Sequence, residues 1–150
     1  MLGFLRSSRN GRKAAPGGAA EIEIGGHNVK VAFDETLTDQ AGNQVIRRIR
    51  SGHFRKTHED DLATVAFILM GTRQFPGASL EVAYLADQKT WEPSMGGKKL
   101  GNRAELIQKI LTAITTGQFP AERSSRTCPN CPALFVCGEV PLGNISKKVS

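Results

Sequence analysis

The three cysteines of this 150-residue chain are its best candidates for metal ligands, because Cys128, Cys131 and Cys137 lie close together near its end. Two thiolates separated by two residues can reach one metal ion from a single tight turn, which Pro129 and Pro132 would stiffen. Thiolates are the usual ligands of iron–sulfur clusters and structural zinc. The spacing therefore favours a metal centre over its alternative, three buried cysteines without a ligand role.

This ligand set is incomplete, since a tetrahedral zinc site or a cubane cluster usually takes four. The chain has three histidines, His27, His53 and His58. Each is more typical of a solvated or hydrogen-bonding residue than of a fourth ligand. A bound small molecule, a partner chain or a vacant position could also complete the shell. The sequence leaves the fourth ligand open, and it does not decide between iron–sulfur and zinc.

Basic residues are concentrated between Gln40 and His58, and this interval contains no acidic residue. They are Arg47, Arg48, Arg50, Arg55 and Lys56. On a strand, Arg48 and Arg50 share one face and Arg47 the other. Guanidinium groups bind phosphate bidentately, so the group is a candidate nucleic-acid-binding surface. A solvated edge strand protected by its charge is the competing interpretation.

The composition limits the class of protein. The chain has 20 basic and 14 acidic side chains, a net charge of +6, which makes an anionic partner plausible. Its hydrophobic fraction of 39%, taken with 16 glycines, is ordinary for a globular chain and excludes disorder throughout. No apolar run reaches the roughly 18 residues of a membrane span. An odd number of clustered cysteines does not fit a disulfide framework. We expect a single-domain cytoplasmic protein with no membrane association.

The hydrophobic pattern predicts an α/β fold. Residues 1–20 are basic and then rich in Gly, Ala and Pro, so we expect a flexible tail there. Strand-like alternation predicts strands over 21–24, 29–34 and 45–50, with Ile46 in the core, and a fourth over 80–85. Helical spacing predicts helices from about 62 to 74 and from about 102 to 114. Trp91 falls in a loop, where we expect it to contact the core. The expected domain covers 21–150.

The end of the chain resembles a known family. Gly117-Gln-Phe-Pro-Ala, followed by the CxxCx5C segment from Cys128 to Cys137, is similar to the C-terminal end of RecB/AddB-type PD-(D/E)XK nuclease domains. The resemblance extends by pattern from about residue 21 to 143 and implies a restriction-endonuclease-like βββαβ core with a C-terminal helix and a cysteine-bearing tail. It also implies DNA as partner, a role in repair or recombination beside a helicase or repair-complex subunit, and a [4Fe–4S] cluster. The family's fourth cysteine precedes the core, where this chain has none.

The resemblance further implies an active site from which this chain departs. The family places an Asp on the second strand, where Asp34 falls, and Asp-x-Lys-Thr-Gly on the third, where Arg48-Ile-Arg50-Ser-Gly stands. The family's Gln-xxx-Tyr pair is absent between residues 60 and 74. Arg48 would repel the Mg²⁺ that two carboxylates normally hold, and Arg50 cannot act as a base.

We therefore expect a degenerate nuclease domain with Asp34 as a catalytic remnant. It would bind DNA without cutting it, and Mg²⁺ is not expected to bind. The alternative is a structural or partner-binding module, clipped by its metal, with no role on nucleic acid. A small zinc protein unrelated to nucleases is a third interpretation.

Overall fold

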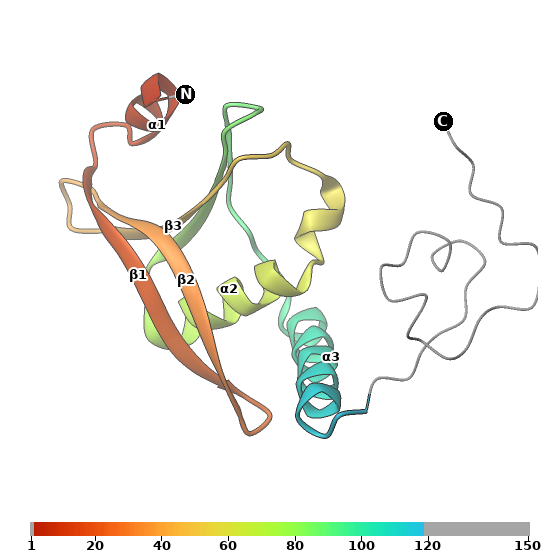
Figure 1. The fold of residues 1–150 in the computed structure, drawn as a ribbon. Coiled ribbons are helices and arrows are strands. Elements are labelled where there is room, and N and C mark those ends of the chain that lie inside the picture. Colours follow the sequence, from red (N-terminus) through yellow and green to blue (C-terminus); the bar gives the residue numbers. More distant parts are fainter. Residues whose placement is uncertain (1, 119–150) are drawn as a thin grey trace, which may run out of the picture. The chain divides into compact units, whose positions relative to one another are not determined.

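The computed structural model describes residues 2–118, which form a mixed α/β fold around one five-stranded sheet (Figure 1). The strands are β1 (Lys13–Ile24), β2 (His27–Thr38), β3 (Gln44–Arg50), β4 (Ser79–Tyr84) and β5 (Lys89–Trp91), in that order across the sheet. Neighbouring strands pair antiparallel except β3 and β4, which pair parallel. The α/β prediction is confirmed at this level.

The helices are α1 (Leu2–Ser8), the 3₁₀ turn η1 (Lys56–Glu59), α2 (Leu62–Gln74) and α3 (Gly97–Thr115). A parallel pair of strands needs a long crossover, and η1 with α2 supplies it between β3 and β4. Asp61 caps α2, because its carboxylate accepts a hydrogen bond from the Thr64 amide at 2.6 Å. Within residues 2–118, no helix is both long and apolar enough to cross a membrane.

The expected strands and helices over residues 21–84 are present, and Ile46 is fully buried. Two later expectations were wrong in detail. α3 begins at Gly97, several residues before the predicted start, because the second of the two glycines that suggested a loop is the first residue of the helix. Trp91 lies on the short strand β5, and its contact with the core is confirmed by Phe54, whose ring centroid is 5.5 Å away.

The predicted flexible tail is wrong where the structure describes it. Residues 2–8 are helical, and β1 begins at Lys13, which pairs with Thr38 in a long hairpin ladder. Arg9 and Arg12 form ion pairs with Glu35 and Glu81. The Gly- and Ala-rich composition lacks a propensity for order, but pairing with β2 supplies backbone hydrogen bonds that override it.

The core lies between the sheet and α2. Ile46 of β3 and Val82 and Tyr84 of β4 pack there against Val65 and Phe67 of α2. Because successive strand residues point to opposite faces, Arg47, which follows Ile46, faces away from this core.

The chain divides into two compact units, Met1–Leu111 and Thr112–Ser150, and the structure describes the second only as far as residue 118. The sheet lies in the first unit, which begins before the expected domain start at 21 because β1 includes residues of the supposed tail. The expected domain over 21–150 stays a prediction, because residues 119–150 lie outside the described range.

β2 and β3 pair only over part of their lengths. Their ladder runs from Glu35 opposite Arg47 to Thr38 opposite Gln44. Before Glu35, β2 continues beside β1, and after Arg47, β3 continues beside β4. The two strands separate at this point, and we call the opening between them the β2–β3 split. Asp34 and Arg48, two of the predicted site residues, lie on its two sides.

Candidate nucleic-acid interface

Asp34 bridges the β2–β3 split through its side chain. The residue is exposed, and its carboxylate accepts a hydrogen bond from the Ile49 amide of β3 at 2.7 Å. The contact holds the two strands together just beyond the end of their ladder. Asp34 is thus on the strand and beside the strand that the resemblance implies, but one of its oxygens is used by the backbone.

Arg48 lies on the other side of the split and is half-buried. Its guanidinium is directed toward the first turn of α2, where Nη1 is 3.5 Å from the Ala63 carbonyl oxygen. Arg48 helps to line a hollow of about 250 Å³ between β2 and α2, together with Val29, Lys30, Val31, Ala32, Ala63 and Ala66. Two of the residues that line this hollow, Lys30 and Arg48, are cationic.

Arg50 is occupied by the start of α2. Its guanidinium lies 2.9 Å from the Asp61 carboxylate and 3.3 Å from the Thr64 hydroxyl. Burial lowers the pKa of Arg50, but the hydrogen bond and charge of Asp61 outweigh it and raise the pKa overall. Burial likewise raises the pKa of Asp61, and its bonds with Arg50 and Thr64 outweigh that and lower it. Arg50 therefore fastens β3 to α2, with only part of its surface free.

The prediction that Arg47 contacts nucleic acid is wrong. Its side chain is 0% exposed, and its guanidinium lies 3.4 Å from Glu35 of β2 and 2.5 Å from Glu81 of β4. The same guanidinium donates to the carbonyl oxygen of Ser8 at 2.9 Å. Because Arg47 is covered by α1 and neutralised by two carboxylates, it cannot reach a phosphate.

Arg55 and Lys56 are exposed at the start of η1. His58 belongs to this turn and packs against β4. Its ring stacks on Tyr84 with an interplanar angle of 8°, and its Nδ1 lies 3.1 Å from the Tyr84 hydroxyl. The exposure of Arg55 and Lys56 suits contact with a polyanion. In the described chain neither has a salt bridge to a carboxylate.

The residues present do not fit a Mg²⁺ site. In the described range 2–118, no three His, Cys, Asp or Glu side chains come together in a way that could hold a metal ion. Glu35 follows Asp34 in sequence, but its carboxylate is bound by Arg9 and Arg47. Cys128, Cys131 and Cys137 lie outside the described residues. Of the candidate fourth ligands, His53 contacts Asp87 at 2.5 Å and His58 contacts Tyr84.

The sequence did not predict a site role for Lys30, or the burial of the carboxylates of Glu35 and Glu81. The alternation of β2 would have placed Lys30 on a solvent face, but nothing in the pattern put it beside Arg48. Glu81 alternates with the core residues Val82 and Tyr84, so the pattern placed it on the face away from the core and gave no sign that this face is covered.

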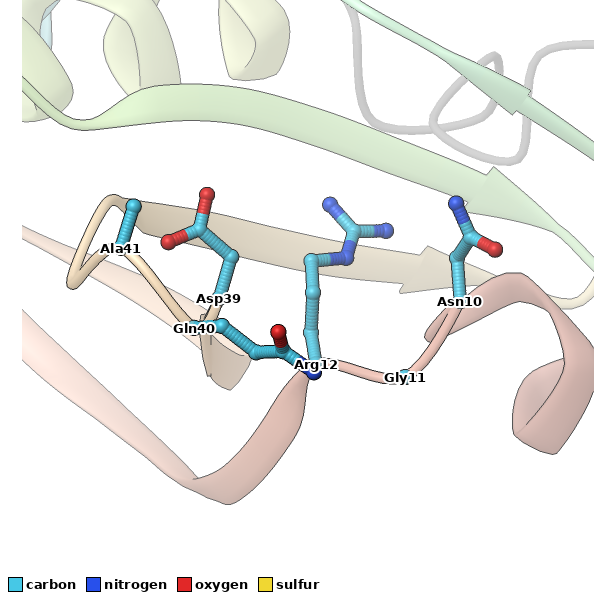
Figure 2. Close-up of a pocket in the computed structure, with 6 residues that line it drawn as sticks. All are labelled: Asn10, Gly11, Arg12, Asp39, Gln40 and Ala41. Carbon is cyan, nitrogen blue, oxygen red and sulfur yellow. The ribbon is translucent and has the colours of Figure 1, made fainter.

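A second hollow, of about 320 Å³, lies away from the predicted site residues, between the segment before β1 and the β2–β3 turn (Figure 2). Both of its charged side chains, those of Arg12 and Asp39, are already engaged. Asp39 is bonded to the Asn43 side chain at 2.8 Å, which lowers the pKa of Asp39. Arg12 donates to the Ser8 and Arg9 carbonyls and to Glu81. This hollow therefore lacks a free charged group suited to a ligand.

Comparisons with known proteins identify no family for the chain. No family model matches it, and no curated protein does. A solved structure described as "Crystal structure of SSO0001" is similar with a TM-score of 0.50 and 15% sequence identity, over 91% of this chain and 66% of that one. This chain thus spans slightly less than two thirds of that chain's length. At this identity the similarity concerns the fold alone.

Proposed function

We propose that this chain binds DNA at the β2–β3 split and does not cut it. The observation that carries the proposal is the hollow that Lys30 and Arg48 help to line. Two cations at one hollow suit a phosphate, and Arg55 and Lys56 at the start of η1 are further exposed cations. Arg47 has no part in this surface.

The proposed absence of cutting rests on the neighbours of Asp34. Metal-dependent phosphodiester hydrolysis needs carboxylates that hold the ion against the scissile phosphate. Across the split from Asp34 stands Arg48, a cation that would repel Mg²⁺. Arg50 is always protonated and already paired with Asp61, so it cannot accept a proton from water.

We further propose that the chain is a degenerate relative of RecB/AddB-type PD-(D/E)XK nucleases. Three antiparallel strands, a crossover helix and a fourth strand parallel to the third are similar to that family's βββαβ order. On this proposal the chain acts in DNA repair or recombination beside a helicase or repair-complex subunit. Its three cysteines would hold an iron–sulfur cluster, with zinc as the alternative.

Fluorescence anisotropy with a labelled DNA duplex and the matching single strand tests binding. Arg48→Ala and Lys30→Ala should each weaken binding, and each lost phosphate contact should reduce the duplex salt slope by about 0.9. Lys109→Ala, an equal loss of charge at an exposed position on α3, is the matched control. Equal affinities for the Arg48 and Lys109 variants would exclude the split as the binding site. No binding to either DNA would favour the structural or partner-binding alternative.

Incubation of the same DNA with Mg²⁺ tests the absence of cutting. The DNA should stay intact at protein concentrations that saturate binding. Degradation that requires Mg²⁺ and disappears in Asp34→Ala would show an active nuclease and refute this half of the proposal.

A further inference from the structure

β1 is the edge strand of the sheet and carries a long stretch without charge. It pairs with β2, and no other strand of the described chain lies on its outer side (Figure 1). Its charged residues stand toward its ends, Lys13 at the start and Glu21 and Glu23 near the finish. An edge strand presents unpaired N–H and C=O groups that can pair with another chain.

Contacts from α2 indicate which backbone groups point outward. The Gln74 side chain donates to the carbonyl of Glu21 at 3.0 Å, and Arg73 donates to the carbonyl of Glu23. These carbonyls therefore point away from β2, and α2 covers that end of the edge. In an antiparallel pair, alternate residues direct their backbone groups to the same side, so Ala15 and Ala19 also point outward.

We propose that two copies of this chain associate through antiparallel pairing of their β1 edges, about a two-fold axis at Gly17. In this register Ala15 lies opposite Ala19 of the partner subunit. The Glu21 carbonyl is already bonded to Gln74, so the backbone ladder ends at Ala19. Just beyond the ladder, the Lys13 side chain lies opposite Glu21 of the partner subunit, and the symmetry repeats that pair at the other end. Opposite charges that face each other across strands stabilise the pairing.

The same charges disfavour the other arrangement. A parallel pairing would place Lys13 against Lys13 of the partner subunit, a pair of like charges. Edge strands usually carry charges or prolines that block pairing, but the middle of this edge has no charge. The backbone groups of odd-numbered residues point outward, and those of even-numbered residues point toward β2. The N–H that Pro16 lacks would therefore face β2, so Pro16 removes no donor from the outer edge. The occupant that fits is a second copy.

Sedimentation equilibrium of the full chain tests the proposal, which does not depend on DNA binding. The wild-type protein should show a monomer–dimer equilibrium. Lys13→Glu and Glu21→Lys should each raise the dimer Kd by about tenfold, because each removes two facing pairs and creates two like-charge contacts. The double variant should restore the wild-type Kd. Lys98→Glu, on an exposed residue of α3, is the control and should change nothing.

Ala19→Pro removes an outward N–H from each copy and should abolish the dimer while circular dichroism shows a folded chain. A wild-type protein that stays monomeric at every concentration, as it would if residues 119–150 covered the edge, overturns the proposal. So does a dimer whose Kd is unchanged by the charge variants, or a double variant that fails to recover.

Discussion

Arg47 and Glu81 face each other on the parallel strands β3 and β4 and form a buried ion pair, with their side chains 0% and 8% exposed. Glu35 of β2 approaches the same guanidinium at 3.4 Å. The ion pairs therefore tie together three neighbouring strands on the side of the sheet away from the core. Arg9 and Arg12 bring α1 to the same two carboxylates.

Arg47→Met should destabilise the protein by about 3–5 kcal/mol, because it leaves buried carboxylates without their cation. Urea denaturation measures the loss. Arg6→Met, on an exposed residue of α1, should change the free energy of unfolding by less than about 0.5 kcal/mol. A loss below about 1 kcal/mol in Arg47→Met would mean that Arg47 is not buried among these charges in solution.

Gly17→Ala should destabilise the hairpin of β1 and β2. A Cβ at Gly17 would lie 2.1 Å from the Phe33 carbonyl oxygen, which is backbone and cannot move aside cheaply. We expect a cost of about 1–3 kcal/mol by thermal or urea denaturation. At Gly18 a Cβ would meet only the Phe33 ring at 3.6 Å, an ordinary contact, so Gly18→Ala is the matched control. Equal effects of the two changes would contradict the close approach at Gly17.

Asp61→Asn should make the protein less sensitive to acid. Burial raises the pKa of Asp61, but Arg50 and Thr64 lower it below its ordinary value of 3.8. The stabilisation that comes from a lowered folded-state pKa is complete above about pH 4. It is lost as the pH falls through the folded pKa. Asn keeps the cap of α2 but not the charge. The stability advantage of wild type over the variant should therefore shrink below about pH 4.

Denaturation of both proteins at several pH values checks this expectation. If the difference between them stays constant down to about pH 3, Asp61 does not carry the acid sensitivity.

Cys131→Ser should remove the metal that the cysteine cluster is proposed to hold. Anaerobic purification followed by elemental analysis should find iron with acid-labile sulfide if the centre is a cluster, or zinc if it is a zinc site. The variant should lose that content. Wild-type protein that contains neither metal would leave the cysteines without a ligand role.

Periodicity was sufficient to predict β2, β3, β4 and α2, because their buried faces repeat at strand or helix spacing. It failed at residues 13–20, where small residues carry no hydrophobic pattern and order comes from pairing with β2. It also failed at β5, a three-residue strand that is too short to show a period.

The site was harder to predict than the fold. Alternation correctly separated Arg48 and Arg50 from Arg47, but it could not say which face would be covered. Arg47 lost its access to solvent because α1 lies over it, and α1 came from a segment whose composition suggested no structure. Lys30 joined Arg48 only because β2 and β3 separate after their short ladder.

The ion pair between Arg12 and Glu81 joins residues 69 positions apart. During synthesis Arg12 emerges long before its partner, so α1 and the first residues of β1 cannot reach their final contacts until β4 has been made. The segment around Arg12 is thus made well before it can form this contact. Contacts between residues so far apart in sequence slow folding. Until β4 arrives, the basic segment around Arg9 and Arg12 is exposed to whatever polyanions surround the nascent chain.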